Sequence, residues 1–307
     1  MKMKKLSLIA ALLFAATQIS AQSVPFLNIT SDPYAAAMGG NTLTIGENAF
    51  TASNNASAMA FSENKFRVGG SYQSWQPDYM NNSIIGFSGF ATLGEKWAIG
   101  LGGKMFGYQS YEITDSYGTP KGEFSPKESA FEGAIAYRIS ESISAGVNVR
   151  SISSKLAKDG SASTIGADVS LTYKKGNTTL AAAVTNLGGS IDYGMKNTYD
   201  LPSMVKFGGA YIFNIADEHN LSVNLESDIL MSDSAFMGSA AVEYSLKNTL
   251  NLRAGYHMGN EEAIPSYASL GLGLNFKAFN IDAAYLLGGG ENSVLNGSFG
   301  VALGLKF

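Results

Sequence analysis

The chain alternates apolar with small or polar residues over most of its length. Residues 299–307 show the pattern most clearly: Phe, Val, Leu, Leu and Phe occupy the odd positions, with Gly, Ala, Gly and Lys between them. A period of two predicts a β-strand. In a soluble sandwich the apolar face would point to a core, whereas in a membrane barrel it faces lipid and the small face lines the lumen.

In other segments the second face carries charged side chains. Arg150 alternates with Val147 and Val149, and Arg253 follows Leu252 in the same way. A continuous row of one-sided strands needs an apolar solvent outside and a wet or ion-paired interior, which a barrel supplies. We therefore expect an ion-paired lumen rather than a selective pore or a catalytic site. The charges assigned to it are Arg150, Asp168, Lys206, Glu226, Asp228, Glu243, Arg253 and Asp282.

Counting the alternating segments predicts about fourteen antiparallel strands. They lie near residues 65–75, 82–92, 95–106, 128–138, 141–152, 163–174, 177–188, 203–213, 218–230, 235–246, 248–259, 266–276, 277–287 and 296–307. Tight turns alternate with longer connections at 76–81, 107–127, 153–162, 189–202, 231–234, 260–265 and 288–295. Outer-membrane barrels have short periplasmic turns and longer outer loops. Because a sandwich would not require this alternation, the fold class we predict is all-β, a transmembrane barrel over residues 65–307.

Composition limits the chemistry of the chain. Its 307 residues are 45% hydrophobic and only 15% charged, with no Cys and two His, His219 and His257. Soluble domains average about 25% charged residues. Without cysteine there is no thiolate nucleophile or thiolate metal site, and two histidines leave little scope for zinc or triad chemistry. Gly100-Leu-Gly-Gly-Lys104 lacks the spacing and the following Ser or Thr of a phosphate loop. We therefore predict a non-enzymatic protein without a cofactor.

The first 21 residues have the features of a cleaved signal peptide. Lysines at the start precede an apolar stretch from Leu6 to Thr17 and a small-residue site at Ile19-Ser20-Ala21. Cleavage would remove three Lys, leaving 18 Lys and Arg against 25 Asp and Glu, a formal charge of −7. An acidic chain argues against nucleic acid as a partner.

Residues 22–64 lie outside the strand series, and we predict that they plug the barrel. Ala35, Ala36 and Ala37 allow a short helix that approaches its surroundings closely, and Gly39-Gly40 would end it. A flexible periplasmic lead is the alternative, but six large apolar side chains of this segment need burial. They are Phe26, Leu27, Ile29, Leu43, Ile45 and Phe50.

The same segment resembles the outer-membrane barrels related to the FadL fatty-acid channel, and within them the PorV/PorQ proteins of the type IX secretion system. That family carries a stretch like FLxIxPDARAAGMG, followed by an NPA step. Here FLNITSDPYAAAMGG, residues 26–40, is similar to the first, with Tyr34 for the usual Arg, and Asn55 stands where the second has Pro. The residues that carry the resemblance are Phe26, Asp32, Pro33, Ala36, Met38, Gly39, Gly40, Asn54 and Ala56.

The resemblance implies a fourteen-stranded barrel in the outer membrane with its N-terminal segment in the lumen. PorV-like proteins are non-enzymatic partners that accept secreted cargo from a translocon barrel through the C-terminal signal domain of the cargo. FadL-like members instead bind a hydrophobic small molecule and pass it through a lateral opening. Beside outer-membrane lipid, the implied partners are thus a translocon and cargo domains, or a hydrophobic ligand.

Aromatic residues on the predicted outer loops are candidates for a partner-binding rim, because such residues are enriched in binding hot spots. The candidates are Tyr79, Tyr117, Phe124, Tyr193 and Tyr199, with Met80, Tyr111 and Met195 near them. For the last four of the first group, local loop packing is the alternative. Trp75 and Tyr108 lie near strand ends, where an interfacial aromatic girdle is the better interpretation.

Overall fold

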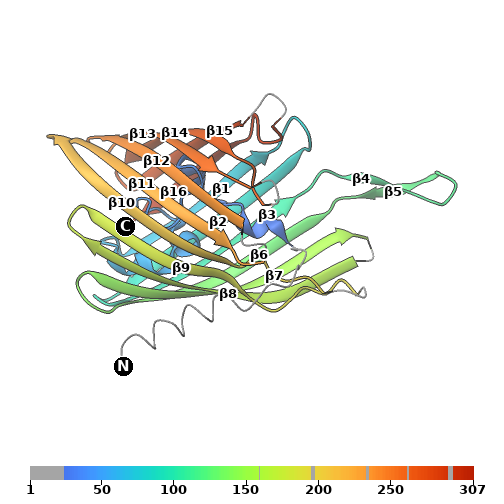
Figure 1. Cartoon of the computed structure of the whole chain (residues 1–307), viewed down its shortest axis with the longest axis horizontal. Coiled ribbons are helices and arrows are strands. Elements are labelled where there is room, and N and C mark those ends of the chain that lie inside the picture. Colours follow the sequence, from blue (N-terminus) through green and yellow to red (C-terminus); the bar gives the residue numbers. More distant parts are fainter. Residues whose placement is uncertain (1–23, 159, 195–197, 233–234, 261–262, 290–292) are drawn as a thin grey trace.

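The structure is a computed structural model that describes residues 24–158, 160–194, 198–232, 235–260, 263–289 and 293–307. Within these residues fourteen antiparallel strands close into one barrel, which confirms the predicted fold class (Figure 1). The barrel strands are β1 (Phe66–Trp75), β2 (Asn82–Leu93), β3 (Trp97–Gly107), β6 (Lys127–Arg138), β7 (Ile143–Ala157), β8 (Gly160–Lys175), β9 (Thr178–Gly188), β10 (Met204–Ala216), β11 (His219–Leu230), β12 (Ala235–Leu246), β13 (Leu250–Met258), β14 (Tyr267–Phe276), β15 (Phe279–Gly288) and β16 (Phe299–Lys306).

The barrel closes between its first and last strands. β1 pairs with β16 from Arg67 opposite Lys306 to Ser74 opposite Phe299. The alternation along β16 has the orientation expected for a membrane barrel: Val301 is 47% exposed on the outer surface, whereas Ala302 is buried in the lumen. Apolar side chains therefore face the lipid and small ones face inward.

Long loops and short turns lie at opposite ends of the barrel, but two predicted loops contain strands. β4 (Tyr111–Thr114) and β5 (Pro120–Phe124) form a separate hairpin within 107–127, and it projects well beyond the barrel at the long-loop end (Figure 1). β7 and β8 extend to Ala157 and from Gly160, so most of the expected loop 153–162 is strand. Ser154, within the predicted loop, lies fully buried on the inner face of β7.

The N-terminal segment, residues 24–64, lies in the lumen of the barrel, enclosed by the strands (Figure 1). Its helices are η1 (Pro25–Asn28), α2 (Pro33–Ala37), α3 (Thr51–Asn54) and η2 (Ala56–Phe61). α2 contacts β13 to β16, whereas η2 contacts β2, β3 and β6 to β8. In the described part of the chain no helix is long and apolar enough to cross a bilayer. The predicted signal peptide lies outside the described residues, as does Met195.

Candidate functional site

The candidate site is the contact between the N-terminal segment and the inner wall, and Asp32 organises the segment side of it. Asp32 precedes Pro33, the first residue of α2, and its Oδ1 accepts the N–H of Tyr34 at 3.0 Å. Its Oδ2 accepts the side-chain amides of Asn48 and Asn54 at 2.7 and 2.8 Å. Burial raises the pKa of the Asp32 carboxyl to about 6, although these hydrogen bonds lower it. Three motif residues, Asp32, Pro33 and Asn54, thus fold the segment onto itself.

Small residues bring the segment into backbone contact with the wall. A Cβ added at Gly255 of β13 would lie 2.3 Å from the nitrogen of Gly39, and one at Gly271 of β14 would lie 2.3 Å from the Cβ of Ala37. The N–H of Gly39 donates to Ser269 Oγ at 3.1 Å, and its φ of 66° favours glycine. The small residues of the motif therefore serve close docking.

Arg253 of β13 joins two wall carboxylates to a tyrosine of the segment. Its Nε and Nη1 each lie 2.6 Å from a carboxylate oxygen, of Glu243 and Asp282 respectively. Its guanidinium carbon lies 3.6 Å from the ring centroid of Tyr34. A cation over an aromatic face is attracted by the ring. Arg253 therefore stabilises both the wall and the docked segment.

Lys206 of β10 marks a second anchor. Its Nζ lies 2.7 Å from Glu226 Oε1 and 3.6 Å from Asp228 Oδ2, and it donates to Thr42 Oγ1 at 2.7 Å. The Oε2 atom of Glu226 accepts the backbone N–H groups of Thr42 and Leu43 at 2.9 and 2.8 Å. Here a wall carboxylate binds the backbone of the segment directly.

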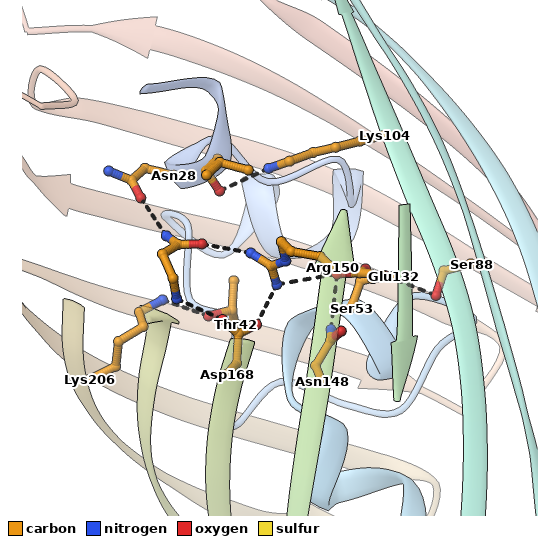
Figure 2. A network of polar contacts seen from close by, with 12 residues as sticks. Asn28, Thr42, Ser53, Ser88, Lys104, Glu132, Asn148, Arg150, Asp168 and Lys206 are labelled. Carbon is orange, nitrogen blue, oxygen red and sulfur yellow. Dashed lines mark hydrogen bonds and ion pairs between the residues drawn. The ribbon is translucent and has the colours of Figure 1, made fainter. Parts of the chain in front are cut away.

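A third anchor surrounds Arg150 of β7 (Figure 2). Arg150 pairs with Asp168 and, at 3.2 Å, with Glu132, and it donates to Asn186 Oδ1 at 2.7 Å. Asn186 in turn donates to Asn28 Oδ1 of the segment at 3.2 Å. The ion pairs at Arg150, Lys206 and Arg253 include all eight charges assigned to the lumen, which confirms the ion-paired interior.

A cavity of about 120 Å³ remains between the segment and the wall. Charged side chains line part of the cavity and apolar ones line much of the rest: Lys104, Glu132, Arg150, Asp168, Lys206 and Asp228 against Trp75, Met204, Met237, Ile264 and Leu286. Lys104 donates to the carbonyl oxygens of Leu27 and Ile29 at 2.9 and 2.7 Å. The space suits a few water molecules or one small molecule.

Apolar side chains fill the lumen at the long-loop end, and we call this cluster the outer cap. Val24, Phe26 and Leu27 of the segment pack there against residues of the strand ends and of the outer loops. The loops contribute Ile191, Leu201 and Leu295, all nearly inaccessible to solvent. The outer mouth is therefore covered by loops that fold inward.

Two of the five rim candidates belong to this cap. Tyr193 and Tyr199 pack against it with ring centroids 6.3 Å apart, and the hydroxyl of Tyr193 donates to Ser154 Oγ at 2.8 Å. The girdle interpretation of Trp75 and Tyr108 was wrong, since Trp75 is 7% exposed inside the cap and the hydroxyl of Tyr108 bonds Glu128 at 2.5 Å. Trp75 ends β1 at an inner-face position, and Tyr108, directly after β3, packs against the cap rather than facing lipid.

The other three candidates lie on outward loops. Tyr117 is 93% exposed in the β4–β5 turn, and Phe124 of β5 packs 5.6 Å from Tyr111 between ring centroids. Tyr79 is about half exposed in the loop after β1. A hydrogen bond joins the bases of the two loops, because the backbone N–H of Gln109 donates to the side-chain Oδ1 of Asn82 at 3.1 Å. We call Tyr79, Met80, Tyr111, Tyr117 and Phe124 the rim face.

The residues considered for catalysis have contacts that serve packing and hydrogen bonding within the fold. The glycine-rich stretch before Lys104 lies within β3, where a Cβ at Gly102 would approach Ser53 Oγ to 2.6 Å. His219 begins β11, with Nδ1 2.5 Å from the Tyr244 hydroxyl, and His257 Nδ1 lies 3.2 Å from the Gly39 carbonyl oxygen. Across the described ranges no His, Asp and Glu side chains gather as a metal site.

A family model described as "Type IX secretion system protein PorV" matches residues 15–235. The chain belongs to the PorV family. A comparison with curated proteins gives no match. Among solved structures, the toluene transporter TbuX of Ralstonia pickettii is 14% identical, with a TM-score of 0.62 and coverage of 92% of this chain and 100% of that one. The toluene transporter TodX of Pseudomonas putida is 13% identical, with a TM-score of 0.62 and coverage of 95% and 99%.

A FadL homologue of Pseudomonas aeruginosa is 14% identical, with a TM-score of 0.52 and coverage of 94% of this chain and 98% of that one. At these identities the likeness concerns the fold. Together with the PorV match, it confirms the resemblance on which the sequence analysis relied. The protein is an outer-membrane barrel of a family of transport proteins.

Sequence reasoning missed several wall residues of the polar lumen in this PorV-family chain. Glu128, Glu132 and Lys104 lie on inner-face positions of their strands, so the period-two pattern could have identified them. Asn186 could not be found in this way. Its φ is 56°, and the register between β8 and β9 shifts beside it, between Ala167 and Val169.

Proposed function

We propose that this barrel is a non-enzymatic partner in type IX protein secretion that binds cargo signal domains or the translocon through the rim face. Membership of the PorV family supports this role. The observation that carries it is the β4–β5 hairpin, which extends beyond the barrel and presents Tyr117 almost fully exposed. Large exposed aromatic groups on a protruding ribbon suit a protein interface better than a membrane or a small ligand.

The arrangement of the lumen supports the same proposal. Ion pairs and backbone contacts hold the N-terminal segment in place, so the middle of the lumen serves as a fixed support for the cap and the loops above it. A protein-binding surface profits from such support because fewer side chains must be ordered on binding.

The test is affinity purification of a tagged copy from native outer membranes in mild detergent, with partners identified by mass spectrometry. We expect a large translocon barrel, or secreted proteins that share a C-terminal domain. Tyr117→Ser should reduce recovery at least about tenfold, as for a hot-spot residue, while Lys158→Ser on the adjacent β7–β8 turn should leave it unchanged. Recovery of the barrel alone would contradict the proposal.

Passage of a small apolar molecule is the second candidate. The cavity between segment and wall favours it, and the structural relatives include proteins described as toluene transporters. The charged part of the lining argues against it, because burying an apolar molecule there desolvates Lys104 and Asp228. Release of a bound apolar compound on solvent extraction of the purified protein would favour this candidate over protein binding.

A further inference from the structure

A second cavity, of about 420 Å³, lies at the short-turn end of the barrel, opposite the rim face, and its lining includes Ala60 and Ser62 at the end of the N-terminal segment. It is a groove between the β2–β3 turn and the β6–β7 turn, which neighbour each other because β3 pairs with β6. Four charged residues line it, Glu95, Lys96, Arg138 and Glu141, beside the apolar Trp97 and Ile139. The volume lies in the range of small-molecule sites.

The charged side chains of this groove are not paired with one another. Over the described residues, Glu95, Lys96, Arg138 and Glu141 form no ion pair. At another pair of turns on the same rim the charges do neutralise one another, since Lys247 Nζ lies 3.3 Å from Glu218. Two cations and two carboxylates therefore remain available in one groove.

Arg138 is fixed in place with one donor unsatisfied. Its Nη2 donates to the carbonyl oxygen of Glu141 at 3.1 Å, and its guanidinium carbon lies 5.2 Å from the ring centroid of Phe61. Its backbone N–H donates to the carbonyl oxygen of Lys96 at 2.7 Å. The Nε atom is buried and has no hydrogen-bond partner. A buried guanidinium donor left unpaired is costly, so the position favours an acceptor from outside the chain.

An aromatic pair beside the groove indicates that the groove lies close to the lipid headgroups. The rings of Trp97 and Tyr137 pack at a tilt with centroids 4.6 Å apart, and Trp97 is 47% exposed on the outer surface. Aromatic pairs of this kind mark the membrane interface of barrels. Ile139, 54% exposed, lies at the mouth of the groove. The charged residues of the groove therefore lie next to a surface that acyl chains would cover.

We propose that this groove binds the headgroup of a zwitterionic phospholipid with a primary ammonium, such as phosphatidylethanolamine. Arg138 and Lys96 bind the phosphate, Glu95 and Glu141 accept hydrogen bonds from the ammonium, and an acyl chain lies along Trp97. Phosphatidylglycerol has no ammonium for the carboxylates. The choline of phosphatidylcholine has no N–H to donate.

The test is native mass spectrometry of the full barrel after delipidation, titrated with phosphatidylethanolamine, phosphatidylglycerol or phosphatidylcholine of identical acyl chains. Wild-type protein should retain the first at least about tenfold better than the other two, the effect of one or two charge-assisted hydrogen bonds. Lys96→Gln with Arg138→Gln should abolish this preference. Lys174→Gln with Lys175→Gln, at the β8–β9 turn of the same rim, removes equal charge and should preserve it.

Changing the acids gives the sharper outcome. Glu95→Gln with Glu141→Gln leaves the two cations, so the preference should reverse towards phosphatidylglycerol while the barrel stays folded, as judged by its heat-modifiable migration on gels. Equal retention of all three lipids by wild-type protein would overturn the proposal.

Discussion

The outer cap and the middle of the lumen are filled by the same N-terminal segment but held by different interactions. In the cap, Phe26 and Leu27 meet apolar side chains, many of them from loops. In the middle, Tyr34 and Thr42 meet charged wall residues, and Gly39 meets the backbone of β13. Apolar contacts can be exchanged for others of similar area. A displaced ion pair leaves a buried charge, so the middle fixes the segment and the cap can adjust.

Removing the charge of Arg253 should have the largest effect on the stability of the middle region. Arg253→Met leaves Glu243 and Asp282 buried without their partner, and breaking such a pair costs about 3–5 kcal/mol. The midpoint of urea unfolding in detergent should fall accordingly. Adding Glu243→Gln and Asp282→Asn should restore most of the loss, since no unpaired charge remains. An unchanged midpoint in the single variant would show that water in the lumen compensates the charge.

Asp32 gives a pH-dependent test of the same region. Its pKa is raised in the folded protein, so its contribution to stability is complete below the unfolded value of 3.8 and is lost as pH rises through about 6. The loss corresponds to roughly 3 kcal/mol. Protease resistance of residues 24–64 should decline between pH 4 and pH 7. Asp32→Asn should be nearly flat over that window, and a matching decline in this variant would assign the titration to other groups.

How far the sequence predicts this architecture depends on what determines each part. The lipid requires every strand to show an apolar face, so period two locates the fourteen strands within a few residues. The β4–β5 hairpin does not contact lipid, and there the period-two pattern did not predict the strands. The same alternation also predicts which charged residues lie on the inner face. Their partners depend on strand register: Arg253 of β13 reaches Asp282 on β15, two strands away.

The sequence does not predict whether an outer loop projects away from the barrel or folds into its mouth. Tyr117 and Tyr193 lie on loops of similar predicted character, yet the first is exposed and the second packs into the cap. What separates them is local pairing: β4 and β5 satisfy their own backbone groups and can stand away from the barrel. In the described part of the loop with Tyr193, a bridge joins Ile191 to Tyr199, and the loop gains stability by burying its apolar side chains.

Because the segment docks closely on the wall, Gly→Ala substitutions should stabilise the protein at some strand positions and destabilise it at others. In a strand, Ala is ordinarily better than Gly by about 0.5–1 kcal/mol, and Gly133→Ala, with 3.8 Å to the nearest atom, should follow that rule. Gly255→Ala instead places its Cβ against Gly39 and should cost about 1–3 kcal/mol. Unfolding midpoints of the two variants provide the comparison. Stabilisation in both would mean that the segment shifts away from β13 without cost.

The smallest expected effect separates the loop part of the cap from its wall part. Ile191 on the loop and Ile152 on β7 are both fully buried in the cap, and Ile→Val at either site removes one methyl group, worth about 0.5–1.5 kcal/mol. If the cap adjusts independently of the barrel, Ile191→Val should raise hydrogen exchange in residues 24–29 and leave the unfolding midpoint unchanged. Ile152→Val should lower the midpoint, because its backbone belongs to the barrel. Equal shifts of the midpoint would show that cap and barrel unfold as one unit, and the segment would then be as fixed at its outer end as it is beside Arg253.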